Sequence, residues 1–146
     1  VKNFISYDTP YNSLLFYHEL GTGKTCSAIG ITEMMRTQLK NEINFKKIII
    51  IASPNVQENF KLQLFDPSKL KLERDGSWKL NTCVGPELLN EINPTNIKGM
   101  KKEQIIKNIK NIIRQYYHFT GYDSIANFSA SDDLRNVIRN EKKKRK

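Results

Sequence analysis

The hydrophobic and polar positions of the chain fall into blocks that alternate between strand-like and helix-like patterns. Residues 47–52 read Lys-Ile-Ile-Ile-Ile-Ala, a β-branched apolar run typical of a strand buried on both faces of a parallel sheet. A shorter apolar run at residues 13–17 predicts an earlier buried strand, and residues 24–39 predict a helix between the two. A strand, a helix and a second strand in this order form a βαβ unit, so the two strands should be parallel.

Residues 100–117 carry the clearest helical periodicity. Their apolar residues form one stripe at helical spacing: Ile105, Ile106, Ile109, Ile112, Ile113, Tyr116 and Tyr117. The opposite face is basic, and we interpret it as a solvated helix face in preference to a surface that tracks phosphates. It consists of Lys102, Lys107, Lys110 and Arg114. Further helices are predicted over residues 56–65, 86–92 and 123–128, and a short strand over residues 117–120.

Alternating apolar residues surround an Asp75-Gly76 pair, which is a turn signal for a β-hairpin. The alternating residues are Leu70, Leu72, Trp78, Leu80 and Thr82. We expect Trp78 to pack within this hairpin instead of serving as a platform for base stacking. We also expect the hairpin to be an insertion over residues 66–84. The predicted fold class is therefore α/β, with a mainly parallel sheet flanked by helices and an inserted β-hairpin.

The length of 146 residues fits one domain or part of one. The formal net charge is +9, from 24 basic and 15 acidic residues, but residues 142–146 are all basic, and without them the balance is 19 minus 15, or +4. This charge is consistent with a polyanionic partner without requiring one. We interpret residues 129–146 as a polar, basic tail or linker.

The sequence has no apolar run long enough to span a membrane and no secretory signal, so no membrane partner is expected. Its two cysteines, Cys26 and Cys83, stand far apart in the chain and lack the spacing of metal ligands. They indicate an intracellular, reducing compartment and no metal site.

The candidate chemistry follows the first predicted strand, where residues 18–25 read His-Glu-Leu-Gly-Thr-Gly-Lys-Thr. The two glycines lack a Cβ, so the backbone can turn sharply and present N–H groups to phosphate oxygens. Lys24 can reach the β- and γ-phosphates, the Thr25 hydroxyl can hold Mg²⁺, and the next helix directs its partly positive N-terminus at the same anion. The usual G-x-x-x-x-G-K-[ST] pattern begins with glycine, so His18 makes this a relaxed Walker A loop.

The predicted nucleotide-binding residues are His18, Glu19, Leu20, Gly21, Thr22, Gly23, Lys24, Thr25 and Cys26. Lys24 and Thr25 are the predicted catalytic residues, Thr25 is the predicted Mg²⁺ ligand, and His18 is expected to fill space at the end of the strand. The alternative is a plain glycine-rich turn, against which the apolar run before the loop and the helix after it both argue.

A second loop, at Ser53, Pro54 and Asn55, follows the strand predicted over residues 47–52. Ligands of open α/β sheets bind beyond the carboxyl ends of strands, so this loop and residues 21–25 should share one face of the sheet. Two readings of the loop are equally open: it contacts a ligand, or it is a connector in which serine or asparagine caps the next helix.

Several blocks of the sequence resemble one family, the superfamily-2 helicase-like ATPases of large cytoplasmic DNA viruses, especially those related to the poxvirus early transcription factor small subunit and its giant-virus counterparts. The blocks are residues 3–6 with 8–15, then 18–29, 53–60, 88–94 and 116–127, in the expected order. The resemblance implies a RecA-like P-loop domain in which residues 21–25 are motif I and bind ATP with Mg²⁺. It also implies that motif Ia, at Ser53, Pro54 and Asn55 with Asn59 in the same block, lies along a DNA or RNA backbone.

Residues 122–127 resemble the segment just before motif II, but the apolar strand ending in Asp-Glu that defines motif II does not follow. The arginine finger and the second RecA-like domain are also missing. We therefore expect residues 1–146 to be the front part of domain 1 of a longer helicase, and to hydrolyse no ATP alone. The resemblance implies the rest of that helicase, a nucleic acid and viral transcription machinery as partners, and the host cytoplasm or the virion as location.

Two other readings stay open. The chain could belong to a different P-loop enzyme, such as a small kinase or an AAA-type remodeller, although the lid with substrate-binding arginines that a kinase needs is not recognisable. It could also be a non-catalytic docking or transcription-initiation piece whose P-loop is structural.

Overall fold

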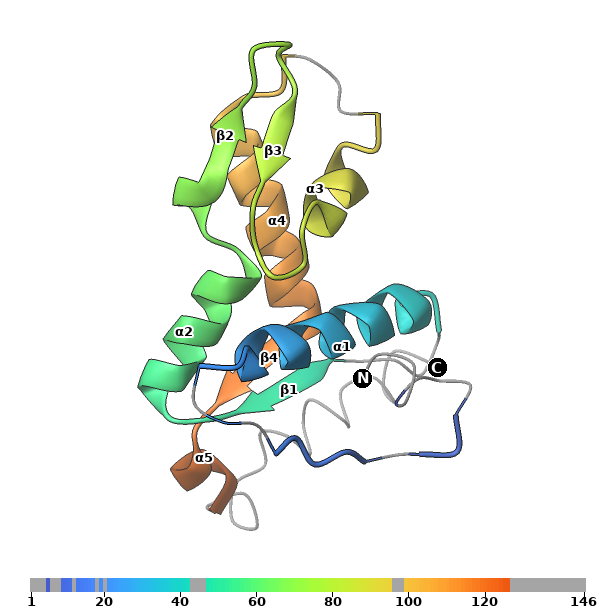
Figure 1. The fold of residues 1–146 in the computed structure, drawn as a ribbon, viewed down its shortest axis with the longest axis vertical. Helices are drawn as coiled ribbons and strands as arrows, with labels where there is room; N and C mark the ends of the chain where they lie inside the picture. Colours follow the sequence, from blue (N-terminus) through green and yellow to red (C-terminus); the bar gives the residue numbers. More distant parts are fainter. Residues whose placement is uncertain are drawn as a thin grey trace, which may run out of the picture.

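The structure is a computed structural model that describes residues 5, 9–11, 13–17, 19, 21–42, 47–95 and 99–126. It is a mixed α/β fold, as the sequence predicts, with helices, a small parallel sheet and an antiparallel hairpin (Figure 1). In chain order the elements are α1 (Lys24–Leu39), β1 (Ile48–Ile51), α2 (Pro54–Leu64), the 3-10 turn η1 (Pro67–Lys69), β2 (Leu70–Leu72), β3 (Trp78–Leu80), α3 (Glu87–Ile92), α4 (Lys102–Tyr116), β4 (Tyr117–Thr120) and α5 (Tyr122–Ala126). The predicted tail over residues 129–146 lies outside the described residues. Among the described helices, none has the length and apolar character needed to cross a membrane.

The parallel sheet consists of β1 and β4, which pair in register from Ile48 opposite Tyr117 onward. The side chains of Ile48 and Ile50 pack against the core, but Ile49 and Ile51 are 41% and 47% exposed. The predicted strand is therefore present, whereas its predicted burial on both faces is wrong for the part of the chain that the structure describes. Successive side chains of a strand point to opposite faces, and only one face of this sheet meets the core.

The strand predicted over residues 13–17 is not formed, and this segment has no regular secondary structure. Leu15 and Tyr17 are 88% and 95% exposed, so this segment is not buried either. β1 and β4 pair with each other in a two-stranded sheet, which leaves the segment without a neighbour to complete a hydrogen-bonded ladder. The parallel partner of β1 is β4, so the crossover runs through α2 to α4 and not through α1.

The predicted hairpin is confirmed: β2 and β3 are antiparallel, with Leu72 opposite Trp78. The turn between them uses Gly76 at a φ of 84°, in the left-handed region that glycine adopts without strain. Trp78 is half-buried, and its indole Nε1 donates a hydrogen bond to the carbonyl of Met100 at 2.9 Å. The predicted structural role of Trp78 is therefore confirmed, because the indole ties the hairpin to the segment that leads into α4.

One core joins the lower part of Figure 1, with the sheet, α1 and α2, to the upper part with the hairpin and α3. Its deepest members, each 0% exposed, are Ile29 of α1, Leu64 of α2, Leu88 of α3, and Ile105 and Ile109 of α4. Leu70 and Leu80 of the hairpin belong to the same core. The long amphipathic helix α4 packs against both parts along one face. Because that face is buried over most of its length, α4 has the clearest helical periodicity in the sequence.

A disulfide joins Cys26, in the first turn of α1, to Cys83, in the loop between β3 and α3. The two Cα atoms lie 5.1 Å apart although the residues are 57 positions apart in the chain. The two cysteines are therefore paired, and they do not support the predicted reducing compartment. Separation along the sequence says nothing about distance in the fold, and here the packing of the hairpin region onto α1 brings the two sulfurs together.

Candidate nucleotide-binding loop and its supports

The candidate phosphate loop owes its shape to two glycines. Gly21 and Gly23 have φ angles of 80° and 83°, in the left-handed region that strains other residues. A Cβ added at either position would meet nothing within 4 Å, so backbone conformation and not crowding is what requires glycine. Gly23 is the N-cap residue of α1, so the chain turns directly from this loop into the helix.

Lys24 and Thr25 are the first two residues of α1, at the end of the helix that favours anions. The Lys24 Nζ donates a hydrogen bond to the backbone carbonyl of Glu19 at 2.8 Å. The Thr22 hydroxyl donates to the same oxygen at 2.7 Å. The ammonium group is thus folded back over its own loop, and a phosphate would have to compete with this carbonyl for it. His18 and Leu20 lie outside the described residues.

The residues around this loop fit a phosphate group better than they fit a metal ion alone. The first N–H groups of a helix have no acceptor within the helix, and the first turn of α1 carries no acidic side chain to neutralise them. Thr25 offers one hydroxyl oxygen, and the described residues contain no group of three or more His, Cys, Asp or Glu side chains placed to hold a metal. Mg²⁺ would therefore need oxygens from a bound phosphate as well as from Thr25.

The second predicted loop lies at the surface, at the start of α2. Ser53, Pro54, Asn55 and Asn59 are all exposed. Ser53 occupies the N-cap position of α2, but its side chain makes no capping hydrogen bond, so the capping alternative lacks its defining contact. Gln57 secures the turn instead, because its Nε2 donates to the Ala52 carbonyl at 2.7 Å. Figure 1 shows the N-terminal end of α1 at the same end of the sheet as the carboxyl ends of β1 and β4.

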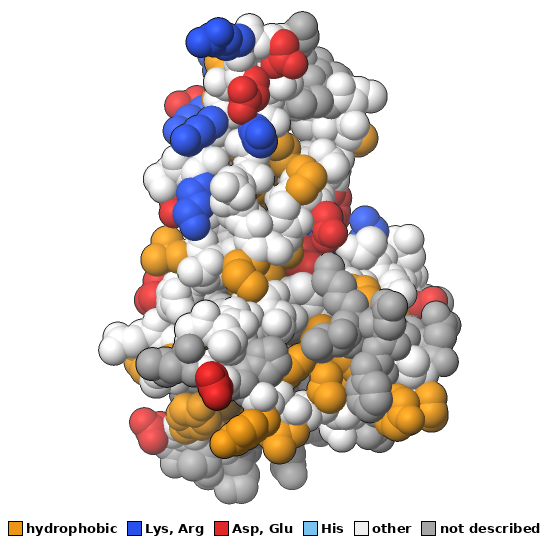
Figure 2. All heavy atoms as spheres, viewed as in Figure 1, with side chains coloured by type: hydrophobic (Ala, Val, Ile, Leu, Met, Phe, Trp, Pro, Cys, Tyr) orange, Lys and Arg blue, Asp and Glu red, His pale blue; other side chains and the backbone are white. Residues whose placement is uncertain are grey.

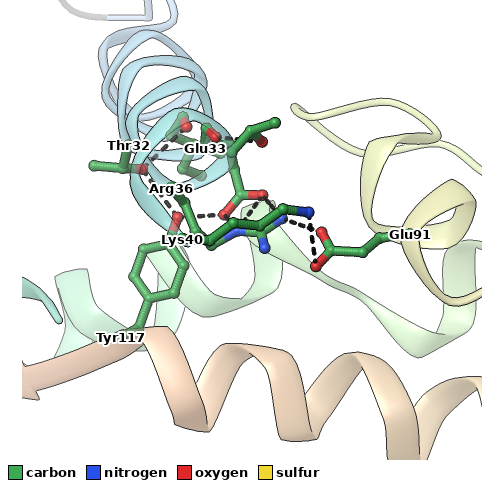
Figure 3. A network of polar contacts seen from close by, with 8 residues as sticks. Thr32, Glu33, Arg36, Lys40, Glu91 and Tyr117 are labelled. Atoms are coloured by element: carbon green, nitrogen blue, oxygen red, sulfur yellow. Dashed lines mark hydrogen bonds and ion pairs between the residues drawn. The ribbon is translucent and has the colours of Figure 1, made fainter. Parts of the chain in front are cut away.

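A largely buried polar network joins α1 to α3 and β4, and the sequence analysis did not predict it (Figure 3). Glu33 and Arg36, both 1% exposed, form an ion pair within α1 at 2.8 Å. A second nitrogen–oxygen contact, also 2.8 Å, joins Arg36 to Glu91 of α3. The Tyr117 hydroxyl at the start of β4 donates a hydrogen bond to Glu33 Oε1 at 2.5 Å. Lys40 adds a longer ion pair to Glu91, at 3.5 Å.

The pKa values in this network follow from burial and from the charges nearby. Burial raises the pKa of Tyr117, and the negative charge of Glu33 raises it further, so this hydroxyl stays protonated. Burial on its own lowers the pKa of Arg36, but its hydrogen bonds to the two glutamates outweigh that effect and hold the pKa above its ordinary value. The network therefore keeps a protonated Tyr117 and a charged Arg36. It ties α1 to α3 and to β4, and so sets the direction in which the first turn of α1 points.

The sequence offered one weak signal for this network, the Glu33 and Arg36 spacing of three residues on a helix. The same spacing is common in exposed helical ion pairs, so it does not by itself indicate burial. The contacts to α3 and β4 come from segments 55 and 84 residues away, which no local pattern predicts.

Sequence comparisons find relatives among proteins of large viruses. L377 of Acanthamoeba polyphaga mimivirus, named as an inferred ATP-dependent RNA helicase, is 25% identical over 140 residues, which are 94% of this chain and 11% of that protein. R563 of the same virus, with the same kind of name, is 39% identical over 64 residues, or 44% of this chain and 10% of that protein. The protein 009L of Frog virus 3, named as an inferred helicase, is 24% identical over 126 residues, or 86% of this chain and 11% of that protein.

These relatives confirm the resemblance to helicase-like proteins of large viruses. The chain spans only about a tenth of the length of the relatives it matches. No protein-family model and no solved structure matches the chain.

Proposed function

We propose that the chain is the ATP-binding front part of the first RecA-like domain of a nucleic-acid-dependent ATPase, a helicase or translocase. The single observation that carries this proposal is the loop in which two left-handed glycines lead directly into a helix that begins with Lys24 and Thr25. The names of the mimivirus relatives support ATP and nucleic acid as the ligands. The whole protein would act in viral transcription, in the host cytoplasm or the virion.

ATP with Mg²⁺ supplies a phosphoanhydride bond whose cleavage drives such proteins. In this chain, the backbone N–H groups after Gly23 and the Lys24 ammonium would bind the phosphates. The Thr25 hydroxyl would provide one ligand to the metal. The buried network would keep α1 in place while the ligand exchanges. The exposed residues Ser53, Asn55 and Asn59 would contact a nucleic-acid backbone.

The test compares two lysines that each begin a helix, Lys24 of α1 and Lys102 of α4. In the full-length protein, we expect Lys24→Ala to abolish ATP hydrolysis stimulated by nucleic acid. In this chain, the same substitution should weaken binding of a fluorescent ATP analogue with Mg²⁺ by at least about tenfold, since it removes the cation closest to the phosphates. Lys102→Ala should change neither quantity. Hydrolysis that is unaffected by Lys24→Ala would remove the loop from the mechanism.

A second function is favoured by a specific observation: the loop does not follow a strand in the described residues, and its lysine is already hydrogen-bonded to Glu19. In that case the loop is structural, and the chain is a docking piece of a transcription complex. ATP binding to the full-length protein separates the two, because a structural loop would bind none.

A further inference from the structure

We propose that a cavity between α2 and α4 binds one nucleotide of a single-stranded nucleic acid, with its phosphate at Lys110 and Arg114 and its base against Phe119. The choice of nucleic acid as ligand rests on the proposed function. The site itself is separate from the ATP loop and from the loop at Ser53, and it uses part of the basic face that the sequence alone marks as solvated.

The cavity has a volume of about 340 Å³, at the lower end of the range for small-ligand pockets, which suits one nucleotide. Three cationic side chains line it, Lys61 from α2 and Lys110 and Arg114 from α4. Lys110 and Arg114 are one helical turn apart, so they lie on the same side of α4. The apolar part of the lining includes Phe119 and Tyr117 of β4.

The charges at the cavity are positive and only partly neutralised. Lys61 pairs with Glu58 at 2.6 Å. Lys110 and Arg114 are exposed and have no ion pair with any of the described residues. Lys47 approaches the backbone of the same helix, with its Nζ 3.5 Å from the carbonyl of Arg114, but it does not line the cavity. Three lining cations, of which Lys61 is paired with a carboxylate, match a phosphate group, and a guanidinium can contact two phosphate oxygens at once.

The aromatic side of the cavity is held in place by its neighbours. The Phe119 ring stacks on Tyr117 with centroids 6.1 Å apart, and it meets Phe60 edge to face at 6.0 Å. The Lys61 Nζ lies 5.0 Å from the centre of the same ring. Because Tyr117 and Lys61 already lie over this ring, a base would pack against the apolar lining beside the cations and not on an open ring face. Such apolar contacts next to cations let a protein bind a single strand without reading its sequence. A peptide rich in acidic and aromatic residues has related chemistry, but the backbone of a nucleic acid repeats the anionic group at every unit.

The test measures binding of fluorescein-labelled 12-mers of dT and of U to the whole chain by fluorescence anisotropy. We expect Lys110→Glu with Arg114→Glu to weaken binding at least about tenfold and to reduce the slope of log affinity against log salt by about 0.7, as expected for one lost phosphate contact. The matched control is Lys102→Glu with Lys107→Glu, which makes the same charge change at exposed positions of the same helix outside the cavity. It should weaken binding less than about threefold.

Equal losses in the two double variants would overturn the proposal, because they would show a general effect of net charge. Absence of binding by the unchanged chain would overturn it too, as would binding of a peptide of alternating Asp and Phe in place of the 12-mers. Circular dichroism checks the fold, and Lys110→Gln with Arg114→Gln replaces the reversed pair if that pair unfolds. Lys24→Ala should leave 12-mer binding unchanged, and the cavity variants should leave ATP binding unchanged, so either proposal can fail without the other.

Discussion

The helices α1 and α4 have nearly equal lengths, 16 and 15 residues, but they enter the core in opposite ways. α4 buries Ile105 and Ile109 completely and keeps its charges at the surface. Figure 2 shows other basic side chains at the surface over the hairpin of β2 and β3. α1 buries apolar Ile29 together with the charged pair Glu33 and Arg36. Hydrophobic burial has no direction, whereas hydrogen bonds and ion pairs require particular partners at particular distances. The contrast indicates that α1 is held in one orientation, as the proposed phosphate loop before it would require.

Buried ion pairs are weak evidence for stability as such, because the cost of removing two charges from water offsets their attraction. Breaking such a pair is a different matter, since one charge then stays buried without its partner. The difference between the two helices can therefore be tested by substitution.

The largest effect is expected for Arg36→Met, which leaves the Glu33 carboxylate buried without its cation. We expect a loss of about 4 kcal/mol in the free energy of unfolding, measured by urea denaturation. The double substitution Glu33→Gln with Arg36→Met should lose less than Arg36→Met alone, because it removes the uncompensated charge. A loss below about 1 kcal/mol for Arg36→Met would mean that the network does not hold α1.

Reduction of the disulfide should come next. Cys26 and Cys83 close a loop with a sequence separation of 57, and a native disulfide typically stabilises by about 3 kcal/mol. Dithiothreitol should lower the melting temperature, and amide hydrogen exchange should speed up in the first turns of α1 but not in α4. Cys26→Ser with Cys83→Ser serves as the control and should not respond to the reductant. Identical melting with and without dithiothreitol would contradict the prediction.

A smaller loss in the free energy of unfolding is expected for substitutions in the apolar stripe of α4. Ile109→Val removes one fully buried methyl group and should cost about 1 kcal/mol in unfolding free energy. Ile106→Val, at a half-buried position of the same helix, should cost less. If Ile109→Val proved as damaging as Arg36→Met, the distinction between the two helices would be lost.

The smallest expected effect is a dependence of the free energy of unfolding on pH. Burial on its own raises the pKa of Glu91, but the hydrogen bond and charge of Arg36 outweigh it and hold the pKa below its ordinary value of 4.5. As the pH falls, the Glu91 carboxylate is therefore protonated in the unfolded chain before it is protonated in the folded chain. The contribution of Glu91 to the free energy of unfolding is present above pH 4.5 and is lost as the pH falls from about 4.5 through the lower pKa of the folded state.

Glu91→Gln should flatten this part of the stability curve, measured as the urea midpoint between pH 6 and pH 3. The comparison is Asp66→Asn, at the N-cap of η1. A hydrogen bond from Ser68 lowers the pKa of Asp66 in the same direction, but this partly buried residue lies outside the network. A larger effect of Asp66→Asn would show that the buried network is not the main source of acid sensitivity.

Local patterns predicted most elements of the fold. The periodicity of α4, the Asp75-Gly76 turn and the β-branched run of β1 each depend on residues close together in the chain, and each element is present. α1 was predicted from the loop before it and the apolar residues within it. The strand prediction for residues 13–17 was wrong because a strand forms only beside a pairing neighbour. Which segment becomes that neighbour is not determined by the local sequence.

For the candidate site, the sequence by itself determined the residue types of the candidate phosphate loop, since glycine adopts left-handed angles freely and Lys24 with Thr25 offers a cation and a hydroxyl in succession. Only the tertiary structure decided which distant residues contact α1 and which surround the cavity. It brought Cys83 to Cys26, Glu91 and Tyr117 to the buried pair of α1, and the cations of α2 and α4 around one cavity. The physical reason is that these groups are distant in the chain, so their contacts depend on how the whole core packs and not on any pattern of neighbouring residues.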